Sequence, residues 1–356
     1  MWSGEHLELG TEHSLDEVCA GTLPWADRFV GYVGGVFGNP DAFVSTYWVD
    51  EDEIEEFCGP YSACAGAPEA FSQVVVSPHE LTHAARGTAV PAQSPVEEGI
   101  AELYGRAPAG TYPLEGDVTN MLRDFGSGKL IPPELYGRAG HFASFVRYAY
   151  GEDALVALRA TSDWNDDWPR TQEVFADALG EPLQTVVQRY ESDYPDACDG
   201  AMFRDTNFDC LGEFIELSGA DEGMPTVIEQ QLACGDAEVF GVVDGRRRQT
   251  FRLHVQQSAW YHIVVETKGG TMPWNVETRT CGQSCMNYGD TPTHFDFGLI
   301  PLPVDPKDGD DVDYGNICVP AGDYAVVLET TATAEESPSL SLLLEFVERN
   351  DECVVR

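Results

Sequence analysis

Basic residues are scarce in this sequence. Twenty lysines and arginines stand against 61 aspartates and glutamates, which gives the 356-residue chain a formal net charge of −41 at pH 7. Such a negative surface repels phosphate backbones and anionic lipid headgroups, so we expect no nucleic-acid partner. The charge does not indicate disorder, because 43% of the residues are hydrophobic and 11% are aromatic, a composition typical of folded domains.

Long hydrophobic runs are missing as well. No stretch reaches the roughly 18 consecutive apolar residues by which a transmembrane helix is recognised. The N-terminal residues also lack the basic and then apolar pattern of a secretory signal peptide. We therefore expect a monomer without a membrane span, whose signal sequence is absent from this chain.

Paired CxxC motifs, the spacing of structural zinc sites, are absent although the chain has ten cysteines. Ten are many for a reducing compartment, so we expect disulfide bonds and an extracellular or cell-envelope location. Five cysteines lie at or before Cys210 and five after it, so complete pairing requires at least one bridge between the two groups. The spacing leaves three local pairs open: Cys58 with Cys64, Cys198 with Cys210, and Cys281 with Cys285.

The first 195 residues have the pattern of an α+β domain, with a short sheet early and helices late. Helical patterns, broken by turns rich in glycine and proline, extend from residue 77 to about 190. Ser14 and Glu17 match a capping box before an earlier helix. The expected strands are 6–9, 43–49 and 71–76, with an acidic helix or turn at 50–56 and a loop at 58–67.

After residue 220 the pattern changes to that of strands. Short β-rich runs are separated by Gly, Pro, Asp and Asn turns, at the spacing of an antiparallel β-sandwich. We expect an all-β domain over residues 225–356 and a connecting segment over 196–224. The expected strands are 239–243, 250–255, 261–267, 274–280, 294–300, 324–329 and 340–347.

The motif that carries chemistry is HExxH, formed by His79, Glu80 and His83. On a helix, residues four apart lie on one face, so the two imidazoles can bind a single Zn²⁺. Zinc lowers the pKa of a bound water toward about 7, and the intervening glutamate can take a proton from that water and pass it to a leaving amine. The alternative is a helix with two surface histidines and a charged neighbour.

A catalytic zinc site requires a third protein ligand and an open position. The metzincin pattern is excluded, because it needs glycine and histidine where this sequence has Arg86 and Ala89. Ser94, Pro95 and Glu97 are typical of a helix start, so we expect a second helix there.

Two glutamates lie one turn apart on this second helix. Glu98 is the expected third ligand, and Glu102, on the same face, would hydrogen-bond a ligating histidine. Glu98 could instead only complement the helix dipole, in which case the ligand would be Glu97.

These motifs resemble those of the gluzincin metallopeptidases. HELTHA (79–84) looks like the thermolysin active-site helix, and EEGIAELY (97–104) is similar to the EGxAE segment of aminopeptidase-like gluzincins, whose first glutamate binds zinc. Residues 136–148 look like a later helix of the same proteins. The gap between His83 and Glu98 is shorter than in thermolysin, so the resemblance is to the superfamily.

The resemblance implies a zincin-like fold over residues 1–195, with one catalytic Zn²⁺ held by His79, His83 and Glu98 and with Glu80 as general base. Gluzincins also use a tyrosine or histidine to stabilise the oxyanion that develops on the carbonyl group. The candidates for this donor are Tyr136 and His141, with Tyr148 and Tyr150 as alternates; all four could instead serve ordinary helix packing.

Three further charged segments have weaker patterns. Residues 205–216 place oxygens at the spacing of a Ca²⁺ loop, but Cys210 stands where the sharp turn needs glycine, so Ca²⁺ is left open. The acidic residues 308–313 have no ligand spacing and are expected to be solvated. The only basic run, residues 246–248, is expected in a turn.

Two classes of function remain. The first is a secreted zinc peptidase, acting as endopeptidase or aminopeptidase on peptide or protein substrates, with a β-sandwich that resembles the accessory domains of secreted bacterial peptidases. The second is a non-catalytic protein whose sandwich binds carbohydrate or protein at a cell surface and whose peptidase-like domain is vestigial. Glu80 favours the first class, because a scaffold has no use for a general base.

Overall fold

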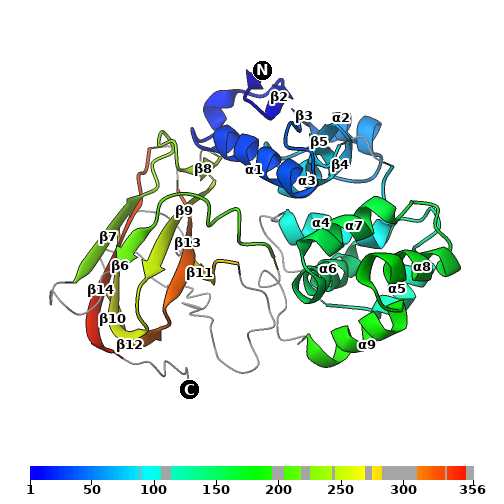
Figure 1. Cartoon of the computed structure of the whole chain (residues 1–356). Helices are drawn as coiled ribbons and strands as arrows, with labels where there is room; N and C mark the ends of the chain where they lie inside the picture. Colours follow the sequence, from blue (N-terminus) through cyan, green and yellow to red (C-terminus); the bar gives the residue numbers. More distant parts are fainter. Residues whose placement is uncertain are drawn as a thin grey trace. The chain divides into compact units, whose positions relative to one another are not determined.

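The structure is a computed structural model in which the chain is mixed α and β (Figure 1). It divides into two compact units: the first contains residues 1–13 and 26–205, and the second contains residues 14–25 and most of the chain beyond 205. The structure describes residues 1–87, 90–105, 114–194, 204–217, 225–242, 245–268, 275–282, 311–332 and 335–349.

The first unit contains a five-stranded mixed sheet with the order β1-β2-β3-β5-β4. The three inner strands run parallel, and both edge strands are antiparallel to their neighbours. Alternate residues such as Leu7, Leu9 and Val44 are fully buried, as expected for strands with one face in a core. The strands are β1 (Trp2–Ser3), β2 (Leu7–Thr11), β3 (Val44–Trp48), β4 (Ala63–Gly66) and β5 (Glu69–Ser72).

Helices form most of the rest of this unit. Helix α3 packs against β3, β4 and β5, and α4 packs against both α3 and α6. Among the helices that the structure describes, none has the length and apolar surface needed to cross a bilayer. The helices are α1 (Thr22–Val36), α2 (Glu51–Cys58), α3 (Pro78–Ala85), α4 (Ser94–Tyr104), α5 (Val118–Asp124), α6 (Tyr136–Tyr150), α7 (Glu152–Thr161), α8 (Trp168–Leu179) and α9 (Leu183–Asp193), with a 3-10 turn at Pro133–Leu135.

Two glycines allow α4 to approach its neighbours closely. A Cβ atom at Gly99 would lie 2.6 Å from the carbonyl oxygen of Ala139 in α6. A Cβ atom at Gly105, just after α4, would lie 2.6 Å from the Cα atom of His79. Non-bonded carbon atoms need about 3.5–4.0 Å, so a larger residue at either position would displace α4 from α6 or from the start of α3.

The second unit contains two sheets that share one hydrophobic core. One sheet, β12-β10-β14-β7, is antiparallel throughout, and the other, β11-β13-β9-β6, is antiparallel except for the pair β6 and β9. Ile263 and Leu342 of the first sheet and Leu253 and Val326 of the second are buried in the same core. The strands are β6 (Ile215–Leu217), β7 (Thr226–Gln231), β8 (Phe240–Gly241, paired with β9), β9 (Arg246–Val255), β10 (Ala259–Lys268), β11 (Asn275–Thr280), β12 (Asp311–Val319), β13 (Gly322–Thr331) and β14 (Ser339–Arg349).

Residues 14–25 group with the second unit, although the sequence pattern assigned them to the first domain. The Cys19–Cys234 disulfide and a hydrogen bond from the Cys19 N–H to the Gly241 carbonyl hold this segment there. Ser14 caps only a short 3-10 turn (Leu15–Glu17). Covalent linkage between distant cysteines, which the local pattern does not reveal, therefore decides where the segment belongs.

Disulfide bonds are present, as the cysteine count predicts. The local pair Cys58–Cys64 forms. Cys210 is bonded to Cys281, so the local alternatives for these two cysteines are wrong. This bond and the one at Cys19 both join the earlier five cysteines to the later five, which confirms the expected long-range bridge.

Several strands differ from the sequence-based prediction. Residues 58–67, expected to be a loop, contain β4, and the strand expected at 71–76 begins earlier, as β5. Strands β6, β7 and β12 were not predicted. β6 is only three residues long, and Ile228 is the only buried residue of β7, so neither shows a clear apolar alternation. The strand expected at 294–300 and residues 308–310 lie outside the described residues.

The basic run at 246–248 lies in β9 and not in a turn. Arg247 is fully buried, and its Nη1 donates hydrogen bonds to the carbonyl oxygens of Leu232 (3.1 Å) and Glu336 (2.7 Å). Arg246 and Arg248 point to the other side of the strand, where both pair with Glu329. Strand alternation therefore separates one structural arginine from two surface ones.

Replacement of the buried arginine should destabilise the second unit. We expect Arg247→Met to lower the free energy of unfolding by about 3 kcal/mol, because one buried and one partly buried carbonyl group lose their charged donor. Arg246→Met is the matched control, with a side chain 59% exposed and an expected loss below about 1 kcal/mol. Urea denaturation followed by circular dichroism measures both, and equal losses would contradict the assignment.

Candidate metal centre

Helix α3 places both histidines of the HExxH motif on one face. Ser77 caps the helix by accepting a hydrogen bond from the Glu80 N–H (3.5 Å). Pro78 occupies the first turn, where its missing N–H is tolerated. The four-residue spacing then brings the rings of His79 and His83 to a centroid distance of 4.9 Å.

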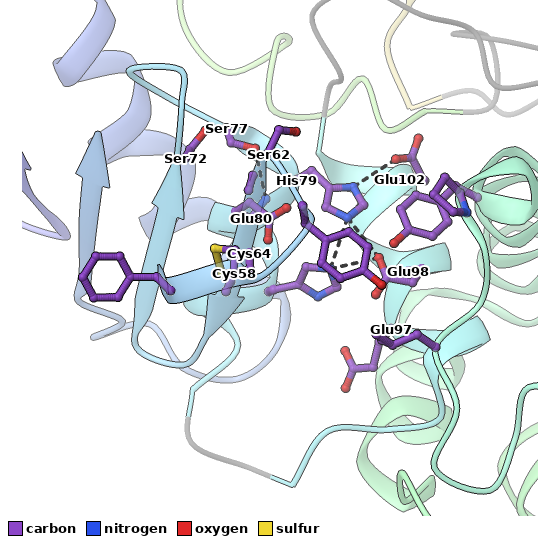
Figure 2. A pocket seen from close by; sticks show the side chains of 18 of the residues that line it. Cys58, Ser62, Cys64, Ser72, Ser77, His79, Glu80, Glu97, Glu98 and Glu102 are labelled. Carbon is purple, nitrogen blue, oxygen red and sulfur yellow. Dashed lines mark hydrogen bonds and ion pairs between the residues drawn. A yellow bond between two sulfur atoms is a disulfide. The ribbon is translucent and has the colours of Figure 1, made fainter. Parts of the chain in front are cut away.

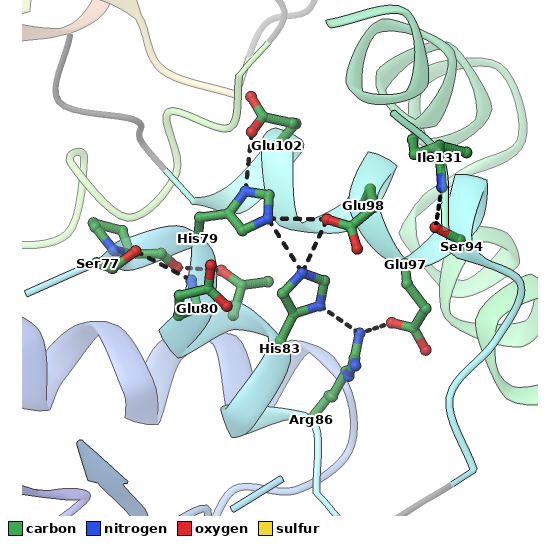
Figure 3. Close-up of polar contacts among 12 residues, drawn as sticks. Ser77, His79, Glu80, His83, Arg86, Ser94, Glu97, Glu98, Glu102 and Ile131 are labelled. Carbon is green, nitrogen blue, oxygen red and sulfur yellow. Dashed lines mark hydrogen bonds and ion pairs between the residues drawn. The ribbon is translucent and has the colours of Figure 1, made fainter. Parts of the chain in front are cut away.

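Helix α4 brings a carboxylate to the same point. Oε2 of Glu98 lies 3.0 Å from Nε2 of His79 and 3.2 Å from Nε2 of His83, and the two Nε2 atoms are 3.2 Å apart (Figure 3). His83 and Glu98 are buried, and His79 is nearly so. These three residues could hold a metal ion, and no other group of three or more His, Cys, Asp or Glu side chains with this potential occurs among the described residues.

Glu102 supports the first histidine from behind. Its Oε1 lies 2.9 Å from Nδ1 of His79, and the Glu102 side chain is almost completely buried. A proton on Nδ1 donated to this carboxylate leaves Nε2 with a free lone pair directed at Glu98 and His83, which is the form of histidine that binds metals.

The charges at this point favour a cation. Burial disfavours the charged form of His79, but hydrogen bonds to Glu102 and Glu98 outweigh it and raise its pKa to about 10. Burial lowers the pKa of His83 to about 4. Burial also opposes ionisation of Glu98, yet the two histidines hold the pKa of its carboxyl well below the usual range. Near neutral pH His79 is then protonated, His83 neutral and Glu98 ionised, so the three groups carry no net charge. The proton on His79 is stabilised by carboxylates on both sides of the ring, and a metal ion bound at Nε2 would take the place of the proton on that nitrogen.

The glutamate at 97, the alternative ligand, has a different role. Its carboxylate pairs with Arg86 and lies 3.7 Å from Arg159, and it accepts a hydrogen bond from the Ala92 N–H. Arg86 also approaches Nδ1 of His83 at 2.9 Å. If His83 binds a metal through Nε2, its proton lies on Nδ1. Arginine can only donate hydrogen bonds, so Arg86 would then keep its contact with Glu97 and lose the one with Nδ1 of His83.

The three residues line a pocket of about 870 Å³ in the first unit (Figure 2). Glu80 lies in the same pocket, and burial raises the pKa of its carboxyl to about 7 despite the attraction of His79. A carboxyl group with this pKa can both accept and release a proton near neutral pH.

Apolar side chains at the pocket are a feature that the sequence analysis missed. Phe57, Tyr61, Val74 and Leu130 all line it, and each is between 46% and 54% exposed. They come from α2, from the loops beside β4 and β5, and from the segment before α6, so only the folded chain brings them together.

The two candidate oxyanion donors lie in different surroundings. Tyr136 lines the pocket, and its ring stacks on that of His79 with centroids 5.6 Å apart. His141, also in α6, is fully buried and does not line the pocket. Its Nδ1 lies 2.7 Å from the hydroxyl of Tyr190. The alternates Tyr148 and Tyr150 do not line the pocket either.

At residues 205–216, where the sequence left a Ca²⁺ loop open, the first residue is engaged elsewhere. The two carboxylate oxygens of Asp205 accept hydrogen bonds from Arg147 and Tyr32, each at 2.7 Å. Cys210, at the position of the required glycine, is committed to its disulfide with Cys281. Asp205, the first donor that Ca²⁺ would need, is therefore occupied by internal contacts.

Comparison with known proteins gives no family for this chain. No family model and no curated protein matches it. Among solved structures, a Podospora anserina GH26-CBM35 β-(1,4)-mannanase is 14% identical over 37% of this chain and 27% of its own, with a TM-score of 0.19. A ruminal GH26 endo-β-1,4-mannanase is 11% identical over 39% and 28% (TM-score 0.18), and a GH115 4-O-methyl-α-glucuronidase is 12% identical over 61% and 30% (TM-score 0.17). The chain spans less than a third of each structure, and likenesses this low do not bear on its fold or activity.

The metal centre can be tested by metal content alone. We expect the protein to retain close to one divalent ion per chain after dialysis, and His83→Ala to lose it, because two ligands hold the ion much more weakly than three. His254→Ala, which changes a surface histidine of the second unit, should retain it. Inductively coupled plasma mass spectrometry measures the ratio, and a ratio unchanged by His83→Ala would exclude this site.

Proposed function

We propose that this chain is a zinc-dependent peptidase that hydrolyses peptide bonds at the pocket of the first unit. The observation that carries the proposal is the convergence of His79 Nε2, His83 Nε2 and a Glu98 oxygen within 3.2 Å of one another, beside Glu80 in an open pocket. A purely structural ion pair among these three residues would not require Glu80, an acid that is not a metal ligand, at the same place.

The donor set supports zinc as the metal. Two imidazole nitrogens and one carboxylate oxygen are typical of catalytic zinc sites that keep a fourth position open. Bonds of about 2.0–2.1 Å in a tetrahedral arrangement separate the ligand atoms by about 3.3 Å. The separations of 3.0, 3.2 and 3.2 Å are close to this value, so the three side chains need only small adjustments.

The side chains around the pocket divide the reaction between them. A zinc ion held there would supply a water of lowered pKa and polarise the carbonyl group of the substrate. The Glu80 carboxylate accepts a proton from water as its oxygen forms a bond to the carbonyl carbon. Glu80 then delivers this proton to the nitrogen as the C–N bond breaks, which leaves a carboxylic acid and an amine.

Tyr136 is the proposed donor to the developing oxyanion. Its position in the pocket wall, stacked on His79, supports this role. His141 is not retained for it, because its ring is enclosed by Tyr190 and Tyr194.

The wider fold and location are part of the same proposal. The first unit would be a zincin-like catalytic domain, in which the mixed sheet precedes the HExxH helix. The second unit would be an accessory β-sandwich, which its two sheets with a shared core support. The disulfide bonds support an extracellular or cell-envelope location.

The pocket favours a polypeptide with apolar side chains near the cleaved bond. Its volume of about 870 Å³ is large enough for several residues, since ligand pockets commonly measure about 300–1,000 Å³. The exposed rings of Phe57 and Tyr61 and the side chains of Val74 and Leu130 would lose apolar surface to water on binding such a segment.

Removal of the proposed base should abolish activity without loss of metal. We expect Glu80→Gln to lower kcat by about 100- to 10,000-fold, the usual contribution of a general base, because an amide cannot accept the proton. Glu56→Gln, on the exposed face of α2, is the matched control with the same change of charge. A peptide-library cleavage assay with metal analysis measures both, and undiminished cleavage by Glu80→Gln would disprove the mechanism.

The proposed oxyanion donor can be tested on the same helix. Tyr136→Phe should lower kcat by about 100-fold or more, as removal of such a donor commonly does, with KM and metal content nearly unchanged. Tyr148→Phe removes a hydroxyl from a residue of α6 that is 43% exposed and should have no effect. Steady-state kinetics on one cleaved peptide compares them; equal kcat values for the two variants would remove Tyr136 from the mechanism.

A further inference from the structure

We propose that Arg204, in the segment that follows the first 195 residues, is a positioning residue for the metal centre. It would act through Glu102 on His79. The inference rests on the proposed metal site, and it adds to that site a residue from the stretch that the sequence pattern treats only as a connection.

The Glu102 carboxylate lies between two partners, one for each oxygen. Oε1 lies 2.9 Å from Nδ1 of His79, and Oε2 lies 3.6 Å from Nη2 of Arg204. Glu102 and Arg204 are 1% and 7% exposed. Because solvent has little access, the carboxylate cannot exchange either partner for water without cost.

The backbone holds Arg204 in place independently of this ion pair. The N–H of the next residue, Asp205, donates to the carbonyl oxygen of Leu103 at the end of α4 (2.7 Å). The Asp205 carboxylate accepts hydrogen bonds from Arg147 of α6 and Tyr32 of α1. Residues 204–205 are thus fixed to the same helix that carries Glu98 and Glu102.

This arrangement has a direct consequence for the metal ligand. A buried carboxylate with one charged partner removed is left with an uncompensated negative charge. The Glu102 carboxylate would then rotate toward solvent, or its hydrogen bond with His79 would change in length and direction. In either case the ring of His79 would lose its fixed orientation. Since orientation of a ligating histidine by its outer partner affects metal affinity by about 10- to 100-fold, Arg204 should contribute to affinity without touching the ion.

The test measures metal affinity directly, with Zn²⁺ in competition with a chromophoric chelator. We expect Arg204→Met to weaken Zn²⁺ binding by about tenfold, at the low end of the range for outer partners. Arg204→Lys, which keeps the positive charge, should recover most of the affinity. Arg170→Met removes a surface arginine of α8 that pairs only with exposed Glu173 and should leave the affinity unchanged.

A double-mutant cycle separates positioning from a general effect on folding. Glu102→Gln keeps an acceptor for His79 but removes the charge that Arg204 contacts. In that background Arg204→Met should cause no further loss of affinity, since the effects of substitutions at two interacting residues do not add. A further tenfold loss in the double variant, or no loss in Arg204→Met alone, would overturn the inference.

The spectrum of the Co²⁺-loaded protein provides a second readout. Arg204→Met should shift the visible absorption bands of Co²⁺ relative to wild type, because the His79 ligand changes orientation, and Arg204→Lys should restore them. If the Met variant does not fold, Arg204→Gln, which also removes the positive charge, takes its place in both measurements with the same expected loss. Wild type that binds no metal would contradict the proposed function; wild type and Arg204→Met that bind equally well would contradict only the role of Arg204.

Discussion

The close packing of α3 against α4 is the constraint on which the site depends. It brings two imidazoles from one helix and one carboxylate from the other to a common point, and it is possible because Gly105 lets the end of α4 lie directly on the backbone of His79. The helices also carry the supporting charges, with Glu102 behind His79 and the Arg86–Glu97 pair behind His83. A site of this kind is organised by the core of the first unit and not by a loop.

Local spacing explains how much of this could be predicted from the sequence. Residues four apart share a helix face, so His79 with His83, and Glu98 with Glu102, follow from the pattern alone, and the structure brings them together. The choice between Glu97 and Glu98 did not follow, because it depends on how α4 is rotated toward α3. That rotation is set by packing against α6, where Gly99 meets Ala139.

Features that depend on distant contacts could not be predicted. The membership of residues 14–25 in the second unit depends on a bond between Cys19 and Cys234. The surroundings of His141 depend on α9, which supplies Tyr190. Arg204 lies outside every motif, and only the path of the chain past α4 brings it to Glu102. The missed strands β6 and β7 are, respectively, only three residues long and provided with a single buried residue, so the sequence shows little alternation in either.

The central claim is that a metal ion lies among His79, His83 and Glu98. The most direct measurement is a crystal structure with anomalous diffraction data collected on both sides of the zinc absorption edge. The account predicts one strong peak about 2.0–2.1 Å from the Nε2 atoms of His79 and His83 and from a carboxylate oxygen of Glu98. A zinc-loaded crystal with no peak at this point, or with its ion bound elsewhere on the acidic surface, would contradict it.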